Sequence, residues 1–301
     1  MSGGNPARAG GVPLGGLALL LTLALFWGAS WPINKIALAE IPLFAFRTVS
    51  LGASVIALFA LAHLAGQPLG LPRRLWPRLA LAALFNVALW NLLVPLGILL
   101  LPAGRASVLF YTTPAWASLL GWIVLGERLG PRRLLAVALG LGAVALLVGG
   151  DIEAALAAPL GIACILAGSI CWAAGAVVMR GFPPAVPTMV LGAWQLLLSL
   201  PAFLLGFLAL ERDLLRPLSA PAWMALGYTI VIGCVFGYWA WFRVVRILPV
   251  AVSSIGSLPV PMVAVLTAVW LTGERPGPAE LAALALVAGA LLAVALPERG
   301  G

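Results

Sequence analysis

The stretch Gly126–Pro131, with the sequence GERLGP, returns 147 positions later as Gly273–Pro278, with the sequence GERPGP. A hexapeptide that recurs so closely within one chain indicates an internal duplication. We therefore predict two related halves, residues 1–150 and residues 151–301. Three further pairs follow the same relation, at a shift of 147 or 145 positions: Pro114 with Pro261, Trp27 with Trp172, and Lys35 with Arg180.

Apolar residues dominate both halves. Hydrophobic residues make up 63% of the chain, charged residues make up 9%, and the mean hydropathy is +1.13. Because a soluble domain carries about 25% charged residues, a water-soluble fold is excluded. Helical runs of about 20 apolar residues match the thickness of a bilayer. We predict ten such spans, at residues 14–36, 42–64, 76–99, 103–125, 132–150, 158–179, 187–209, 221–243, 249–271 and 280–297.

The number of spans in each half determines how the halves are oriented. Five is an odd number, so the second half must enter the membrane from the side opposite to the first. Inverted repeats of this kind recur in transporters, which bind substrate near the midplane between the repeats. The predicted fold class is therefore an all-α polytopic membrane protein of ten transmembrane helices, arranged as two inverted five-helix repeats.

Basic residues are distributed unevenly between the predicted loops. Ten spans place both termini on one side of the membrane, and eleven of the 17 Lys and Arg residues fall on that side. Cytoplasmic loops carry an excess of Lys and Arg, so we predict an inner-membrane protein with both termini in the cytoplasm. The other six basic residues are predicted on the opposite side: Lys35, Arg47, Arg105, Arg212, Arg216 and Arg275.

The net charge of +8 does not indicate a nucleic-acid partner, because the basic residues are scattered between apolar runs rather than gathered in one stripe. Cys164, Cys171 and Cys234 lie inside apolar segments, so we predict neither a disulfide framework nor a metal site. We expect no cofactor. The expected partners are a small-molecule substrate and membrane lipid, with the chain acting as a monomer.

Three features of the duplicated units occur together in a known family. Trp27-Gly28 is followed by Lys35, eight residues after the tryptophan. Pro42 precedes Arg47 in the next predicted span. With the Gly-Glu-Arg hairpins, these features resemble the drug/metabolite transporter (DMT) superfamily, EamA type, and most closely its YddG-type bacterial amino-acid exporters. The resemblance implies an inner-membrane carrier with a basket-like fold of ten helices. The second half departs from the pattern at Trp172-Ala173, where the glycine is missing.

One face of the first predicted helix combines aromatic, amide and cationic side chains, at positions i, i+4, i+7 and i+8: Trp27, Trp31, Asn34 and Lys35. Such a face suits an amphipathic ligand, and interfacial anchoring to lipid is the alternative. Trp27 lies beyond the middle of its span, so we favour a cavity-lining role for it and for its counterpart Trp172. Structural or snorkelling roles are favoured for Lys35 and Arg180.

Further candidates lie where polar groups fall within apolar runs. Buried amides are costly in lipid without partners, and proline frees a backbone carbonyl that a hydroxyl or a ligand can use. The predicted substrate-binding residues are Trp27, Trp31, Asn34, Trp90, Asn91, Tyr111, Trp172, Gln195 and Tyr238. The residues predicted to act in structure or gating are Lys35, Pro114, Glu127, Arg180, Pro261 and Glu274.

The predicted function is export of amino acids, with neutral and aromatic ones favoured, and of related metabolites. Alternating access through a central cavity between the repeats is the expected mechanism. No Asp or Glu lies mid-span, so a carboxylate proton relay is unsupported. A multidrug or cationic-compound exporter stays open as an alternative, because aromatic faces attract cations. A membrane-embedded scaffold or enzyme is the alternative from another class; the sequence lacks HExxH and GxSxG motifs, so we expect no enzyme.

Overall fold

The computed structural model describes residues 14–127, 129–149, 156–183, 185–237, 239–240, 243–244 and 259–295. All regular elements in these ranges are helical. Seven segments are long and apolar enough to cross a membrane: α1 (Leu14–Glu40), α2 (Leu43–Leu64), Arg73–Leu100, Ala103–Leu125, α7 (Pro131–Gly149), α9 (Pro159–Met179) and Thr188–Leu214. Three shorter apolar helical segments follow: Ala220–Phe236, α14 (Pro259–Thr272) and α15 (Pro278–Ala295). The all-helical, polytopic membrane fold is confirmed, and the count of ten spans stays a prediction.

Three of these segments contain π-helical turns, which lengthen the hydrogen-bonded ring by one residue. The third predicted span runs through η1 (Arg73–Leu75), α3 (Trp76–Ala83), the π-turn η2 (Leu84–Leu89) and α4 (Trp90–Leu100). The seventh joins α10 (Thr188–Gly206) to the π-turn η3 (Phe207–Glu211) and to η4 (Arg212–Leu214). The eighth joins α11 (Ala220–Tyr228) to the π-turn η5 (Thr229–Phe236). The shift of 147 places η2 inside η5, so both halves carry a π-turn at an equivalent position. Such turns are frequent at functional sites.

The fourth predicted span, residues 103–125, is matched by the apolar segment Ala103–Leu125, and its helix is interrupted inside the segment. Helix α5 (Ala103–Phe110) ends in a turn at Tyr111 and Thr112, and α6 (Thr113–Leu125) begins there. Pro114 occupies the first turn of α6, where its missing N–H costs no helical hydrogen bond. In the second half, Pro261 lies in the first turn of α14.

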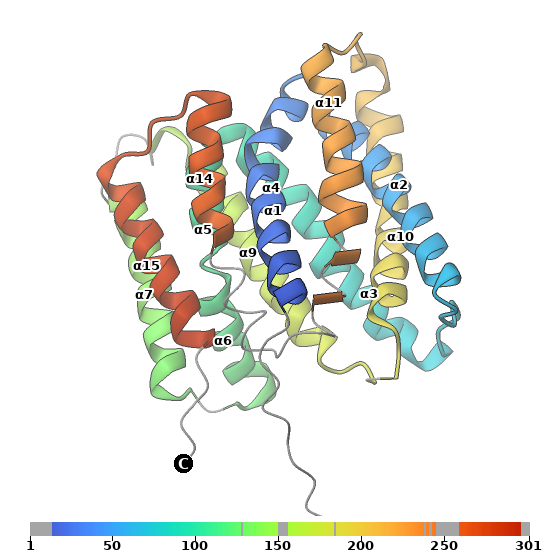
Figure 1. The fold of residues 1–301 in the computed structure, drawn as a ribbon, viewed down its shortest axis with the longest axis horizontal. Coiled ribbons are helices and arrows are strands. Elements are labelled where there is room, and N and C mark those ends of the chain that lie inside the picture. Colours follow the sequence, from blue (N-terminus) through green and yellow to red (C-terminus); the bar gives the residue numbers. More distant parts are fainter. Residues whose placement is uncertain are drawn as a thin grey trace, which may run out of the picture.

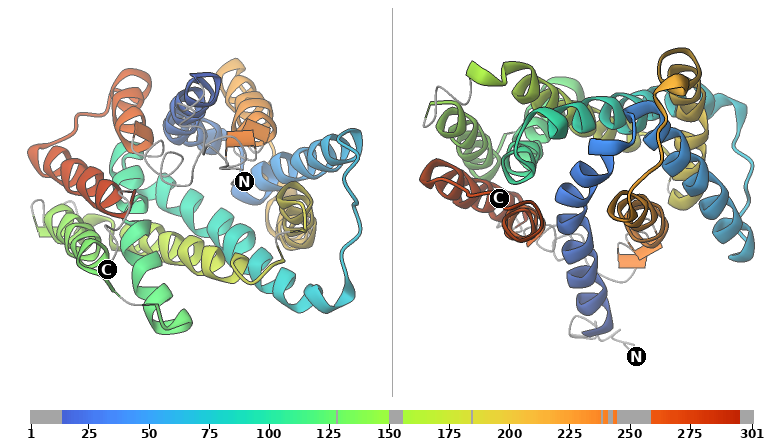
Figure 2. Two further views of the ribbon diagram at one scale, coloured as in Figure 1. Left: turned by 60° about the horizontal axis from the view of Figure 1, so that its bottom comes forward. Right: turned by 90° about the horizontal axis from the view of Figure 1, so that it is seen from above.

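Helices of the two halves are interleaved rather than kept apart (Figure 1). Helix α1 of the first half packs on α11 and α14 of the second half. Helix α9 of the second half packs on α3, α4, α5 and α6 of the first half. Helix α2 packs on α10, and α7 packs on α15. Figure 2 shows the result from two further directions: α7 and α15 lie toward one edge, α2 and α10 toward the other, and α1, α4 and α9 between them.

The two Gly-Glu-Arg hairpins form the same turn at opposite ends of the bundle. Gly126 and Gly273 end α6 and α14 with φ of 66° and 68°, in the left-handed region that glycine adopts without strain. In both turns the backbone amide of the following glutamate donates a hydrogen bond to the preceding helix. Glu127 donates to the Gly121 carbonyl at 3.2 Å, and Glu274 donates to the Ala268 carbonyl at 3.4 Å. We call these ends the Glu127 end and the Glu274 end. Figure 1 shows α1 beginning and α15 ending toward the Glu127 end.

The surface of the bundle is apolar, as lipid contact requires. Trp270 on α14 is 86% exposed and Ile56 on α2 is 73% exposed. Inside the bundle, small residues let helices approach closely, which is how membrane helices associate. A Cβ on Gly168 of α9 would collide with the Val94 side chain of α4. The close helix contacts hold the two halves together, and the side chains of the candidate site lie between the halves.

Candidate substrate site and ion pairs between the halves

Five aromatic side chains from both halves meet where the halves pack together, with Trp31 and Phe110 buried and Trp172 36% exposed. We call this set the aromatic cluster; its centre is Phe110, at the end of α5. The centroid of the Phe110 ring lies 5.5 Å from those of Trp31 and Tyr111, 6.3 Å from that of Trp90 and 6.5 Å from that of Trp172. Trp90 and Trp172 also contact each other, at 5.4 Å. The structure therefore brings four predicted ligand residues together around a fifth that the sequence did not single out.

Phe110 is easily missed because it lies in a long apolar run. The available signal is its position, directly before Tyr111 and four residues before Pro114, where the helix breaks. Its backbone carbonyl accepts hydrogen bonds from the hydroxyls of Thr113, at 2.6 Å, and Ser169, at 2.8 Å. These hydroxyls supply the hydrogen bonds that the Phe110 carbonyl lacks at the end of α5. Ser169 thereby connects the interruption between α5 and α6 to α9.

Trp27 and Asn34 face a different neighbour from Trp31 and Lys35. The Trp27 indole donates to the Gly233 carbonyl at 3.3 Å, and the side-chain amide oxygen Oδ1 of Asn34 accepts from the Thr229 hydroxyl at 2.8 Å. Both acceptor and donor belong to the π-turn η5. The predicted face of α1 is thus shared between η5 on one side and the aromatic cluster on the other. Tyr238, the remaining aromatic candidate, lies outside the described residues.

The predicted amides have partners within the protein. Asn91, 2% exposed, donates to the Val87 carbonyl at 2.9 Å, within the π-turn of its own segment. Gln195 accepts from the Asn86 amide at 3.1 Å and donates to the Leu191 carbonyl at 3.2 Å. Asn86 and Gln195 therefore link η2 to α10, apart from the aromatic cluster.

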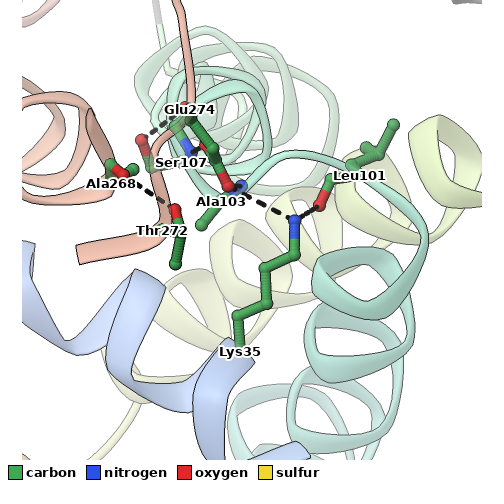
Figure 3. Close-up of polar contacts among 8 residues, drawn as sticks. Lys35, Leu101, Ala103, Ser107, Ala268, Thr272 and Glu274 are labelled. Carbon is green, nitrogen blue, oxygen red and sulfur yellow. Dashed lines mark hydrogen bonds and ion pairs between the residues drawn. The ribbon is translucent and has the colours of Figure 1, made fainter. Parts of the chain in front are cut away.

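A lysine and a glutamate join the halves at the Glu274 end (Figure 3). The Lys35 ammonium lies 3.3 Å from the Glu274 carboxylate and donates to the Leu101 carbonyl at 2.8 Å. The same carboxylate accepts from the backbone amides of Ala103, at 2.7 Å, and Gly104, at 3.0 Å. Glu274 thereby caps the N-terminus of α5, where amides lack helical partners and the helix dipole favours an anion.

An equivalent pair joins the halves at the Glu127 end. Arg180, which follows α9, forms an ion pair with Glu127, and Arg133 on α7 pairs with the same carboxylate at 2.5 Å. The repeat relation maps Lys35 onto Arg180 and Glu127 onto Glu274. Each pair therefore takes its cation from one half and its carboxylate from the other, and the two pairs lie at opposite ends.

Two of the six basic residues predicted on the side opposite to the termini are buried in the bundle. Arg47 on α2 is 4% exposed and Arg105 on α5 is 6% exposed. Arg105 pairs with Glu280 at 2.9 Å, beside a pocket of about 120 Å³ at the Glu274 end. Among the described residues no group of His, Cys, Asp and Glu is arranged to hold a metal ion.

The profile of the EamA-like transporter family matches the chain twice, over residues 14–149 and 159–296. The chain belongs to this family. The resemblance inferred from the duplicated hairpins is therefore confirmed, and the protein is a multi-pass membrane protein of a transporter family. The family match covers both predicted halves of this EamA-like transporter.

Known relatives of this EamA-like transporter match most of its length. It is 32% identical to the "Probable terminal-alkyne amino-acid exporter" of Streptantibioticus cattleyicolor, over 91% of this chain and 89% of that protein. It is 27% identical to the "Uncharacterized inner membrane transporter YedA" of Escherichia coli K12, over 92% and 89% respectively. Similarity to the "Uncharacterized transporter YvbV" of Bacillus subtilis, at 30% identity, spans 59% of this chain and 58% of that protein. One crystal structure shares the fold, with a TM-score of 0.66 and 21% identity over 93% of this chain and 96% of that chain.

Proposed function

We propose that this EamA-like transporter exports amino acids, with neutral and aromatic ones favoured, and related small metabolites. The observation that carries the proposal is the aromatic cluster, in which Trp31, Trp90, Tyr111 and Trp172 meet around Phe110. Such a surface suits a small molecule with an apolar or aromatic side chain. The name of the Streptantibioticus relative, an amino-acid exporter, supports the same substrate class and the direction of transport.

We further propose ten transmembrane helices in two inverted repeats that work by alternating access. The reciprocal packing of α1 on α14 and of α9 on α5 and α6 supports the inversion, because each contact is repeated with the halves exchanged. The Lys35–Glu274 and Arg180–Glu127 pairs support the mechanism. Each would open in the conformation that admits substrate from its own end of the bundle.

The proposed location is the bacterial inner membrane, with both termini in the cytoplasm and the Glu274 end facing outward. The excess of basic residues on the side of the termini supports this orientation, and the name of the YedA relative supports the membrane. We also propose that one chain is the transport unit, since the packing between halves is intramolecular. Reporter fusions at each terminus and light scattering of the purified protein test these two proposals.

The experiment that tests the function is counterflow of a panel of radiolabelled amino acids in proteoliposomes. Trp31→Ala and Trp172→Ala each remove one wall of the cluster. An aromatic contact contributes about 0.5–1.5 kcal/mol, so we expect each variant to weaken apparent affinity by about twofold to tenfold. Trp270→Ala is the matched control, because this tryptophan is 86% exposed on the outer surface of α14.

Two results would contradict the proposal. Transport of no amino acid by folded wild-type protein would reject the substrate class, and cationic compounds would then be tested in the same liposomes. If Trp270→Ala weakened the apparent affinity as much as the cluster variants do, the aromatic cluster would have no specific role in transport. The buried Arg47 guanidinium beside Trp90 disfavours cationic substrates, because like charges repel in a desolvated site.

A further inference from the structure

Arg47 places a positive charge beside the aromatic cluster. Its guanidinium carbon lies 5.0 Å from the centroid of the Phe46 ring and 5.9 Å from that of the Trp90 ring, and the residue is 4% exposed. Charged side chains within membrane helices are costly, and they face the bundle interior, where they commonly mark the path of a substrate.

Trp90, the ring that Arg47 contacts, also carries a hydrogen-bond donor. Its indole nitrogen is buried and has no hydrogen-bond partner in the described part of the chain. The indole N–H of Trp116 donates to the Thr112 hydroxyl at 3.1 Å, and that of Trp194 donates to the Leu69 carbonyl at 2.8 Å. A buried donor without a partner is rare in proteins and calls for an explanation. A ligand that accepts a hydrogen bond is one.

We propose that the Arg47 guanidinium and the Trp90 indole N–H together bind the carboxylate of the substrate, while the aromatic cluster holds its side chain. The proposal rests on the function proposed above and assigns the chemical group that is recognised. A guanidinium presents two parallel donors that match the two oxygens of a carboxylate. The indole N–H adds a third donor, and the site is sheltered from water, where such bonds are strongest.

The shared position of Trp90 explains how the two parts of a ligand would be held together. Its ring lies over Arg47 on one side and contacts Trp172 and Phe110 in the cluster. A molecule that fits both therefore has a carboxylate within a few bonds of an apolar or aromatic group. α-Amino acids have this arrangement, whereas amines, amides and cationic drugs lack the anionic group.

The test compares the best-transported amino acid of the panel with its amide, which keeps the side chain and the ammonium group but lacks the carboxylate. Each is used to inhibit counterflow of the labelled amino acid into wild-type proteoliposomes. We expect the acid to be preferred by at least about tenfold, the effect of losing one hydrogen bond to a charged group.

Conservative variants assign this preference to the two residues. Trp90→Phe keeps a ring and removes the N–H, and Arg47→Lys keeps the charge and removes the planar fork. Each should reduce the preference for the acid severalfold. Trp194→Phe is the control, since its N–H donates to the Leu69 carbonyl, and it should keep the wild-type preference.

An amide that competes as well as the acid in the wild type would overturn the carboxylate site while leaving amino-acid transport intact. The same conclusion would follow if folded Trp90→Phe and Arg47→Lys proteins kept the wild-type preference. Transport of no amino acid in the panel would overturn the proposed function and the carboxylate site together.

Discussion

Gly175 on α9 is a position at which the fold leaves no room for a side chain. A Cβ there would overlap with the Asn86 amide, which donates to Gln195 at 3.1 Å. Overpacking of this kind costs about 1–3 kcal/mol. We therefore expect Gly175→Ala to lower the unfolding temperature measured in detergent.

The control for this prediction is another helical glycine. Gly227 on α11 has no atom within 4 Å of the position of a Cβ, so Gly227→Ala should unfold at the same temperature or slightly higher. Alanine is favoured over glycine within a helix by about 0.5–1 kcal/mol. Equal unfolding temperatures for the two variants would show that the position of Asn86 does not constrain α9.

Residue types could be predicted from the sequence, but their partners could not. The helical period places Trp27 and Trp31 on one face of α1, yet Trp31 contacts Phe110 and Trp27 contacts Gly233. The difference arises because α1 lies between α5 and η5, which only the tertiary structure reveals. Arg47 is ambiguous for the same reason: four residues into a helix, a charge can face a loop or the bundle interior.

Helix α5 begins against a carboxylate from the other half, and this contact can be tested at the level of the element. The Glu274 carboxylate accepts from the amides of Ala103 and Gly104. Glu274→Gln keeps the size of the side chain and loses the charge and one acceptor. Helix caps contribute about 0.5–2 kcal/mol, so we expect a lower unfolding temperature in detergent.

A second variant separates the cap from the ion pair. Lys35→Gln removes the ion pair and leaves both amide contacts of Glu274 in place, so it should be less destabilising than Glu274→Gln. Asp213→Asn, at a carboxylate that is 88% exposed, serves as a surface control and should have no effect. If Lys35→Gln were as destabilising as Glu274→Gln, the capping contacts would contribute nothing.

Elements differ in how well the sequence predicts them. The apolar runs match the seven long segments to within about five residues, because proline, glycine and charges fill the turns between them. The first ten residues of the predicted ninth span, 249–271, lie outside the described residues. The π-turns η2 and η5 were not predicted, since inserting one residue into a helical ring leaves the hydropathy pattern unchanged. Pro114 is a sequence signal for the interruption between α5 and α6 at Tyr111. Proline is also compatible with a continuous, kinked membrane helix, so the signal is ambiguous.

At the scale of the whole molecule, the duplication of the sequence produces two equivalent ion pairs. Each half contributes a cation near the end of its first helix and a carboxylate in its hairpin, and each pair joins one half to the other. Duplication therefore places a similar closure at both ends of one bundle. The alternating access proposed above requires two closures of similar strength, since neither end should dominate.

This equivalence predicts opposite effects from two single substitutions. Lys35→Gln should favour conformations open at the Glu274 end, and Arg180→Gln should favour those open at the Glu127 end. Partly exposed ion pairs contribute about 0.2–1 kcal/mol, so each population should change by about fivefold or less.

The measurement is the labelling rate of a single buried cysteine by a polar maleimide, after the three native cysteines are replaced. Ser107→Cys reports on α5 near the Glu274 end, and Ser118→Cys reports on α6 nearer the Glu127 end; both serines are buried. Lys35→Gln should accelerate labelling at residue 107 alone, and Arg180→Gln at residue 118 alone. Arg212→Gln, which breaks an exposed pair with Asp213, should accelerate neither. Acceleration at the same end by both variants would reject the two-ended closure, because pairs at opposite ends must bias the equilibrium in opposite directions.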